Sequence, residues 1–517
     1  MITILSNNSP VLIPLLFLAF GLIIPLVAWK RNQWAWPTMM LASLGSVAIA
    51  VFNVFKVMDK GPVHYYMGNW VPPIGIEYVL DYLSAFVMVV INLIAFLVLM
   101  HAKKIVPFEL SGKEPPYYAA VSLLLAGLNG IVITGDLFNL YVFLEISSLS
   151  MYGLIASGEK KSPVAAFRYL IMGTIAASFY LLGVGFLYIT TGSLNMADVK
   201  AILPSIAGQP TALIALALMV LGIGIKMALF PLHGWLPDAY TYAPSTSSAV
   251  IAPTGTKVAA YALLRVLFFV FGFSFVTKTI PITNVIMWLA AIGIIYGSIM
   301  AIAQKELKRM LSYSSVAQVG YIGLGIGLAN PWGLIGAVLH VLNHAFMKAC
   351  LFLVAGNFRF KLGHSNIFKL EDSIGKKMPW TMAAFTAAAL SMVGLPPLAG
   401  FFSKWYLALG TIKSTSTSWT GWIFLVVILV SSLLNAVYFF RVLEKVYMKP
   451  MGKKPKNVHE THEKHEKEET IEIKSNEVGA SMLVPTLIMA VGLIVIGLLN
   501  AIIVKGIIAF IIPAGMK

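Results

Sequence analysis

Residues 222–265 read GIGIKMALFPLHGWLPDAYTYAPSTSSAVIAPTGTKVAAYALLR. Apolar residues run directly into Lys226, and Pro231 follows five positions later. After a short polar stretch an apolar helix resumes and carries Lys257. A lysine at bilayer depth costs about 3 kcal/mol on insertion scales, and a proline there removes a helix hydrogen bond. Broken backbone at membrane depth is tolerated where it is buried in protein or lines a cavity, so the stretch predicts an ion path.

The composition indicates a polytopic membrane protein. Of the 517 residues 59% are hydrophobic and only 11% are charged, with a mean hydropathy of +0.85, whereas soluble domains have about 25% charged residues. The net charge of +16 does not indicate a nucleic-acid partner, because basic residues collect in the cytoplasmic loops of membrane proteins. Residues 10–29 are long and apolar enough to span and lack a basic leader, so we expect a helix there and not a signal peptide.

The single cysteine, Cys350, excludes an intrachain disulfide and any all-cysteine iron–sulfur or zinc site within this chain. Its apolar surroundings predict a small core residue. The sequence has no haem-attachment motif and no nucleotide-binding fingerprint. We therefore expect neither a cofactor nor a metal.

Runs of about 20 apolar residues predict an all-α fold with about fourteen transmembrane helices. They lie at 9–29, 34–55, 77–101, 116–134, 137–157, 164–191, 211–241 (interrupted), 246–271, 281–303, 309–329, 331–356, 380–410 (interrupted), 420–445 and 481–513.

Loop charges predict the orientation. With the N-terminus outside, the inside loops carry 23 Lys and Arg and the outside segments carry six. The positive-inside rule therefore places both termini outside the cell membrane and the charged loop 448–480 in the cytoplasm. This loop contains His459, His462 and His465 at three-residue spacing. Such spacing could bind metal on a helix, but the mixed charge favours a solvated linker.

The seventh and twelfth spans are interrupted in similar ways. Lys226 precedes Pro231 in one, and Pro396-Pro397 precedes Lys404 in the other. Matching breaks five spans apart predict two inverted five-helix repeats with a site at the breaks. The expected units are 1–110 (helices 1–3), 115–275 (first repeat), 276–447 (second, inverted repeat), 448–480 (loop) and 481–517 (last helix).

Ionisable residues within the spans predict a proton path. Glu145 lies in the middle of its span, and a buried carboxylate there is either neutral or paired. Lys226 is the expected partner; a buried pair that only joins two helices is the alternative. Lys257 can exchange its proton when buried, whereas Arg265 stays charged and suits a fixed counter-charge or anchor.

The eleventh span places His340, His344 and Lys348 on one helical face, at i, i+4 and i+8. This spacing favours a proton relay over half of a metal site, because no Glu or Cys stands beside them. Backbone opened by the second break can admit water near Lys404. His233 and Asp238 flank the first break and are candidates for stabilising it or for taking up protons.

These motifs resemble the proton-translocating antiporter family. The segments that carry the resemblance span roughly 65–445: MGNWVPPIGIEYVLDYLSAF, TGDLFNLYVFLEI, KMALFPLHGWLPDAYTYAPSTSSAVIAP, KELKRMLSYSSVAQVGYIGLG, HVLNHAFMKACLFLVAG and GLPPLAGFFSKW. The family includes the large subunits of Mrp-type Na⁺/H⁺ antiporters, antiporter-like subunits of respiratory complex I, and relatives in membrane-bound hydrogenases. The DLFNLYVFLEI wording and the length resemble the D-type Mrp chain and its hydrogenase counterpart most.

The resemblance implies fourteen helices, inverted repeats and broken helices seven and twelve. It also implies that a Glu145–Lys226 pair modulates the proton affinity of Lys257, which passes protons by way of His340 or His344 towards Lys404. We therefore expect a proton-translocating subunit that works with other membrane subunits on H⁺, and on Na⁺ if coupled to it. The alternatives are a non-pumping scaffold and a complex I-type quinone oxidoreductase subunit. A long lateral helix, present in one complex I member, is absent from the sequence, which argues against that member.

Overall fold

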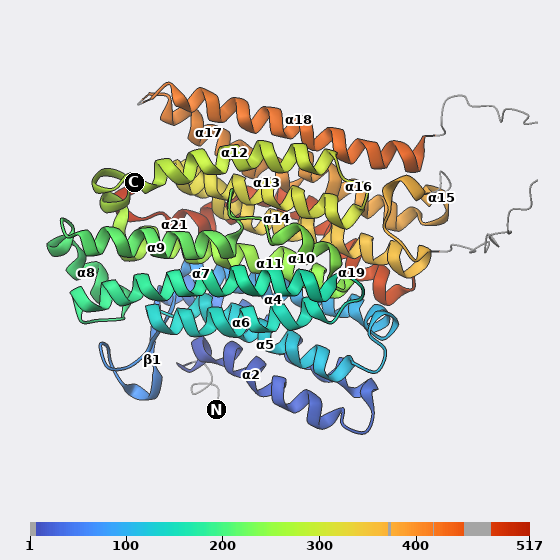
Figure 1. The fold of residues 1–517 in the computed structure, drawn as a ribbon, viewed down its shortest axis with the longest axis horizontal. Coiled ribbons are helices and arrows are strands. Elements are labelled where there is room, and N and C mark those ends of the chain that lie inside the picture. Colours follow the sequence, from blue (N-terminus) through green and yellow to red (C-terminus); the bar gives the residue numbers. More distant parts are fainter. Residues whose placement is uncertain (1–6, 371–373, 417, 449–476, 517) are drawn as a thin grey trace, which may run out of the picture.

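The structure is a computed structural model that describes residues 7–370, 374–416, 418–448 and 477–516. The chain forms a bundle of long, roughly parallel and antiparallel helices (Figure 1). The first part consists of α2 Ser9–Val27, η1 Asn32–Trp34, α3 Ala35–Lys60, β1 Val63–Tyr66, η2 Met67–Asn69, β2 Glu77–Leu80, α4 Tyr82–Glu109, α5 Glu114–Ile133, α6 Leu137–Ala156, α7 Ser162–Thr191, α8 Met196–Ile206, α9 Pro210–Met227, α10 Leu236–Tyr242 and α11 Ser245–Leu264.

Two π-helical segments continue α11, and the second part of the bundle follows. Its elements are η3 Arg265–Gly272, η4 Phe275–Thr279, α12 Ile282–Ile302, α13 Leu307–Gly327, α14 Pro331–Leu362, η5 Ile367–Lys369, α15 Ile374–Lys377, α16 Pro379–Val393, α17 Ala399–Ser414, α18 Thr420–Tyr447, α19 Ala480–Leu498, α20 Asn500–Ile503, η6 Val504–Ile508, α21 Ala509–Ile511 and η7 Ala514–Met516.

The prediction of a helical, multi-pass membrane protein is confirmed. Within the described residues, twelve helices are long and apolar enough to cross a membrane. The tenth predicted span, α13, is not among them because it carries many polar residues, and α16 and α17 are shortened by the break between them. The predicted loop 448–480 and its three histidines lie almost entirely outside the described residues.

Three local features differ from the expected spans. The third begins at Tyr82 and not at Glu77, because residues 77–80 pair with 63–66 in an antiparallel hairpin. A short amphipathic helix, α8, fills the connection before α9. The last span is interrupted after Leu498 and ends in shorter helical segments.

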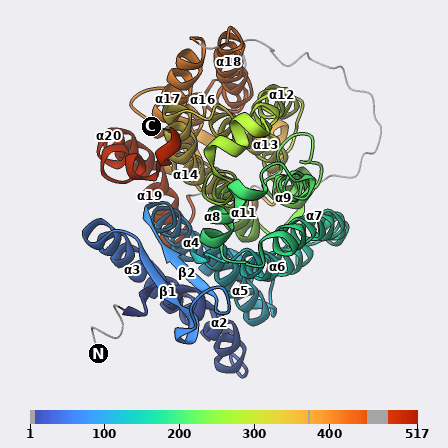
Figure 2. The same ribbon diagram turned by 90° about the vertical axis from the view of Figure 1, so that its left-hand side faces the viewer.

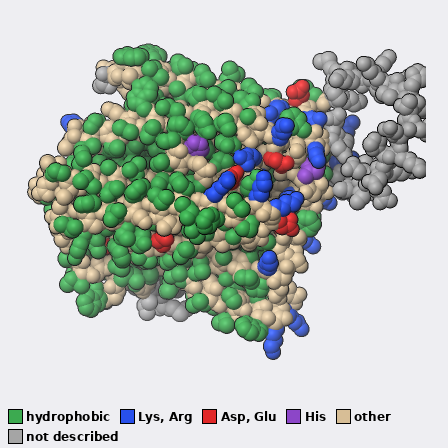
Figure 3. Space-filling view, viewed as in Figure 1, with side chains coloured by type: hydrophobic (Ala, Val, Ile, Leu, Met, Phe, Trp, Pro, Cys, Tyr) green, Lys and Arg blue, Asp and Glu red, His purple; other side chains and the backbone are tan. Residues whose placement is uncertain are grey.

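Charge is unevenly distributed along the helix axes. Lys and Arg gather towards one end of the bundle, while hydrophobic side chains cover most of the remaining face (Figure 3). The β-hairpin, α8 and the C-terminus lie towards the opposite end (Figures 1 and 2). A broad apolar surface bounded by charge at one end is what a bilayer-embedded bundle requires.

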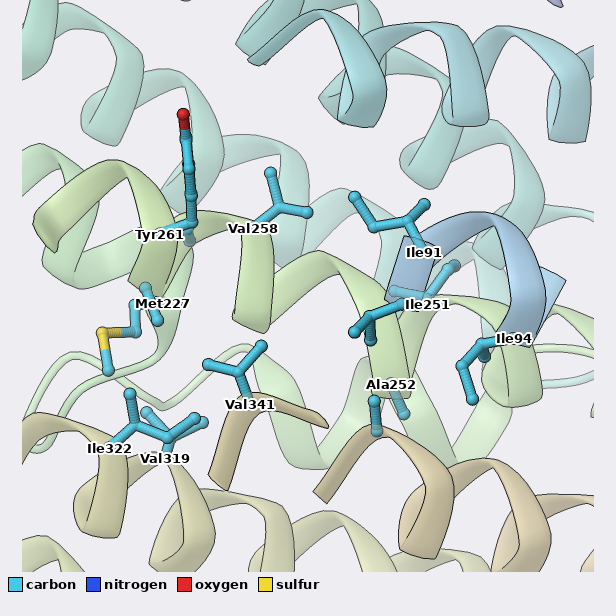
Figure 4. Packing of buried hydrophobic residues seen from close by; sticks show 14 of the residues in the cluster. Ile91, Ile94, Met227, Ile251, Ala252, Val258, Tyr261, Val319, Ile322 and Val341 are labelled. Atoms are coloured by element: carbon cyan, nitrogen blue, oxygen red, sulfur yellow. The ribbon is translucent and has the colours of Figure 1, made fainter. Parts of the chain in front are cut away.

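The centre of the bundle is formed by α11 and α14. The most apolar 18-residue stretch of α14 is wholly buried within the protein, whereas about a third of the corresponding stretches of α2, α3 and α18 is buried. Apolar residues of α11, such as Ile251 and Val258, lie between those of α4 and those of α13 and α14 (Figure 4). Polar side chains on these central helices are therefore shielded from lipid by the outer ones.

Candidate functional site

An ion pair at one end and hydrogen bonds at the other connect α4 with α11, the helix that carries Lys257. At one end Arg265 donates to Asp81 through both terminal nitrogens, at 2.6 and 2.8 Å. Asp81 also caps α4, and its ion pair gives Arg265 the fixed counter-charge that suits an anchor. At the other end Glu109 accepts from the Ser245 backbone N–H at 2.7 Å and pairs with Arg359 at 3.3 Å. The position of Lys257 along the bundle is thus set at both ends of its helix.

Lys226 lies in the last turn of α9, directly before the first break. Its ammonium donates to Ser148 Oγ at 2.6 Å and to the Tyr152 hydroxyl at 3.3 Å, both on α6. Glu145 lies one turn from Ser148, and one of its carboxylate oxygens is buried without a hydrogen-bond partner among the described residues. Lys226 and Glu145 do not form a direct ion pair in this structure. The predicted Glu145–Lys226 ion pair therefore stays a prediction. It requires Lys226 to turn from its α6 hydroxyl partners towards Glu145.

Lys257 is buried in α11, with 1% of its surface exposed. Its ammonium donates to the Ala252 carbonyl at 2.6 Å and to Thr256 Oγ1 at 3.3 Å. Thr256, Lys226 and Ser148 line one buried cavity of about 30 Å³. Such a volume holds a water molecule or two, so a space that can be hydrated extends from Lys226 to Thr256, the neighbour and hydrogen-bond partner of Lys257.

The histidines of α14 are completely buried. His340 lies between Ser403 Oγ and Gln318 Oε1, each at 2.9 Å from one ring nitrogen. The His344 ring stacks on that of His340 at 5.6 Å between centroids, and neither of its nitrogens has a hydrogen-bond partner among the described residues. An imidazole with both nitrogens free can accept and pass on a proton without breaking an existing bond.

Lys348 and Lys404 complete the predicted set. Lys348 donates to the Leu311 carbonyl at 2.7 Å and to Ser314. Lys404 lies after the second break and donates to the carbonyls of Met392 and Val393 at 2.9 and 3.0 Å, and to Ser432 Oγ at 3.0 Å.

The elements that carry these groups follow one another across the bundle. α9 contacts α11, α11 contacts α14, and α14 contacts α17, an order that is visible in the view down the helices (Figure 2). Lys226, Lys257, the α14 residues and Lys404 therefore form a row through the protein centre. We call these residues, with Glu145, the central row.

The flanking candidates lie at the first break but not in the central row. Asp238, on α10, pairs with Arg168 at 2.7 Å and with Arg309 at 3.1 Å. The His233 ring stacks on Phe230 and meets Tyr296 edge-on. Both contacts fit the predicted role in stabilising the break.

Several contacts of the site were not predicted. Lys308, expected in an inside loop, is 5% exposed and donates to the Ala243 carbonyl. It lines a charged cavity of about 570 Å³, together with Glu109, Lys160, Arg359 and His364. No signal within 305–309 marks Lys308 as buried, because its burial depends on the connection between α10 and α11. Among the described residues, no group of three or more His, Cys, Asp or Glu is placed to hold a metal.

The comparisons with known proteins agree with the arrangement. Residues 134–435 match the family described as "NADH:quinone oxidoreductase/Mrp antiporter, TM". The chain belongs to this family.

Members of the family from several complexes are similar to this chain over most of its length. The N subunit of the NADH-quinone oxidoreductase of Desulforudis audaxviator is 46% identical over 98% of this chain and 99% of its own. The D-type subunit of the Na⁺/H⁺ antiporter of Alkalihalophilus pseudofirmus is 31% identical over 77% of this chain and 79% of its own. A chain in the structure of the membrane-bound sulfane sulfur reductase, an archaeal respiratory membrane complex, superposes with a TM-score of 0.86 at 28% identity, covering 97% of this chain and 96% of its own.

Proposed function

We propose that this protein is the proton-translocating, antiporter-like membrane subunit of a multi-subunit complex. The observation that carries the proposal is the state of its four buried lysines, Lys226, Lys257, Lys348 and Lys404. Within the described part of the chain, none of them forms a salt bridge with a carboxylate; each is held by neutral oxygens. An uncompensated buried ammonium is costly, and a lysine resolves that cost by releasing its proton.

The central row gives the steps an order. A proton held on Lys257 passes by way of His344 or His340 towards Lys404, from which it leaves. His344 has free nitrogens for this transfer, and His340 contacts Ser403, the residue before Lys404. Movement of Lys226 between its α6 hydroxyl partners and Glu145 changes the charge that Lys257 experiences, and thereby its proton affinity.

The test is proton transport by the native complex in proteoliposomes with Lys257→Gln. We expect transport to fall at least about tenfold while the complex assembles, because a carrier with no exchangeable charge breaks the path. The matched control is Lys200→Gln, an exposed lysine before the first repeat's broken helix. A Lys257→Gln complex that transports at the wild-type rate would contradict the proposal and favour the non-pumping scaffold.

The relatives support a parent complex made of several membrane subunits. The oxidoreductase, the antiporter and the sulfane sulfur reductase complex that contain the similar chains are each assemblies of several subunits by their names, so we propose other membrane subunits as partners. Extraction in mild detergent and mass spectrometry of the co-purifying proteins distinguishes the cases. Another antiporter-like chain with small apolar partners indicates an Mrp-type antiporter; cysteine-rich iron–sulfur partners indicate a redox-driven pump. A protein that purifies alone and active would contradict a multi-subunit assignment.

We further propose two inverted five-helix repeats, 115–275 and 276–447, with both termini outside the cell membrane. The support is the matching position of the breaks, after α9 and after α16, and the one-sided distribution of Lys and Arg (Figure 3). A Cys350→Ala background with either Lys160→Cys or Lys200→Cys tests the orientation. A membrane-impermeant maleimide applied from outside should label the second site and not the first, and the reverse pattern would invert the topology.

A further inference from the structure

One buried hydroxyl in the site has no role in the steps above. Tyr240, on α10, is 1% exposed, and its hydroxyl lies close to the Thr256 side chain but forms no hydrogen bond of ordinary geometry with any described residue. Leaving such a group unpaired costs free energy comparable to a hydrogen bond or more, and a buried polar group without a partner calls for an explanation. Tyr240 lines the 30 Å³ cavity that also touches Lys226, Ser148 and Thr256.

The surroundings fix the ring of Tyr240 while leaving its hydroxyl free. The ring meets Trp235 edge-on at 6.1 Å and Phe352 at 6.2 Å between centroids. The Tyr240 carbonyl accepts from Ser248 Oγ at 2.8 Å, which ties α10 to the start of α11. These contacts involve the ring and the backbone, so removing the hydroxyl oxygen leaves each of them in place.

Lys226, which lines the cavity, and Lys257, which does not, each donate to the hydroxyl of a residue in its wall. Lys226 donates to Ser148 Oγ, and Lys257 donates to Thr256 Oγ1. Between these two hydroxyls the cavity offers room for water and the unpartnered Tyr240 hydroxyl. A chain of O–H groups can therefore connect the two ammonium groups.

We propose that Tyr240 is the proton-relaying hydroxyl between the Lys226 and Lys257 sites. Its oxygen accepts a proton from the Lys226 side as its own O–H proton passes to the Thr256 side. Thr256 takes that proton and gives its own to the neutral amine of Lys257. Each hydroxyl ends with one proton, Lys226 has lost one and Lys257 has gained one, so no charged tyrosine is formed.

This inference rests on the proposed function, and the experiment separates the two. Proton transport by the native complex in proteoliposomes is measured for Tyr240→Phe, Thr256→Val and the control Tyr118→Phe, a buried tyrosine of α5 whose hydroxyl reaches only the Ala102 carbonyl, at 3.4 Å. We expect the first two variants to be about three- to tenfold slower, as the loss of one hydrogen-bonded step implies. The control should transport at the wild-type rate.

Two readouts distinguish a relay from packing. Loss of a relay step should change the solvent isotope effect of transport in D₂O, which a packing defect would leave alone. Tyr240→His should restore part of the rate with a new pH dependence, because an imidazole can both donate and accept. If Lys257→Gln is inactive while Tyr240→Phe transports at the wild-type rate, only the assignment of Tyr240 is overturned. If Lys257→Gln is fully active, the proposed function itself fails.

Discussion

The two helix breaks of this protein look alike in sequence but hold their lysines differently. α9 ends at Met227 with Ala228 in a left-handed conformation, φ 60°, and α16 ends at Val393 with Gly394, φ 95°. At the first break the Ile225 carbonyl accepts from the Trp235 indole N–H at 2.8 Å. At the second, the ammonium of Lys404 itself caps the final carbonyls of α16.

Because of this difference, Lys404 supports the backbone of its break, whereas Lys226 does not. Since an indole closes the first break, Lys226 is free to turn to the α6 hydroxyls and towards Glu145. Lys404 is bound to the backbone that the break exposes, where a cation also complements the helix C-terminus. Loss of a proton from Lys404 must therefore weaken the second break, whereas Lys226 can change partners without disturbing the first.

The largest expected effect is on transport through the first break. Lys226→Met and Glu145→Gln should each lower proton transport at least about tenfold, because the charge that modulates Lys257 is lost. Stability should change little, because neither side chain has an ion-pair partner that the substitution would leave as an unpaired buried charge. Transport in proteoliposomes and thermal denaturation in detergent measure the two. If these variants lost stability as well as transport, the two breaks would not differ in the way described.

At the second break, transport and stability should fall together. Lys404→Met leaves the Val393 carbonyl without this donor and the Met392 carbonyl with the Asn435 amide at 3.2 Å, at a cost of about 1–3 kcal/mol in the free energy of unfolding. It also removes the last proton carrier of the proposed path. Lys404→Arg keeps a donor for the carbonyls but does not release its proton. That variant should regain stability and remain inactive; an arginine variant that transports would show that Lys404 only supports the backbone.

The stability of the first break should depend on the Trp235 indole N–H, as that of the second depends on the Lys404 ammonium. The effect at the first break should be smaller. Trp235→Phe keeps an aromatic ring against Tyr169, on which the indole stacks at 3.9 Å, but removes the N–H that reaches Ile225. The Ile225 carbonyl still accepts from the Ala228 N–H at 3.0 Å, so the loss of the indole hydrogen bond should cost about 0.5–1.5 kcal/mol in the free energy of unfolding. Thermal denaturation, with the largely exposed Trp422→Phe as control, measures the change. No difference between the two variants would mean that the Ala228 N–H alone satisfies the carbonyl.

The sequence revealed the buried lysines but not how they are held. Lys226, Lys257 and Lys404 could be recognised because a lysine within an apolar run is rare and costly. Their partners Ser148, Thr256 and the Met392 carbonyl could not, since serines, threonines and carbonyls are common in helices and only tertiary packing selects them. For the same reason the orphan hydroxyl of Tyr240 and the burial of Lys308 were missed. The expected direct contact of Glu145 with Lys226 required a distance, which sequence does not contain.

The smallest expected effect on stability is at α10, the helix that follows the first break. Asp238 of this helix forms two ion pairs. Its partners Arg168 and Arg309 have 63% and 32% of their side chains exposed, and such pairs are screened by water, so Asp238→Asn should lower stability by less than about 1 kcal/mol. Among the residues that the structure describes, no such ion pair lies at the second break; there Asn343 donates to the Ala399 carbonyl at 2.6 Å, a neutral contact deep in the bundle. Raising the salt concentration should therefore weaken the wild type towards the Asp238→Asn variant in thermal denaturation. Salt should leave the difference between wild type and Lys404→Met unchanged, because that break is shielded from ions. An equal response to salt at both breaks would mean that α10 is held by its apolar contacts, with Asp238 available for proton uptake.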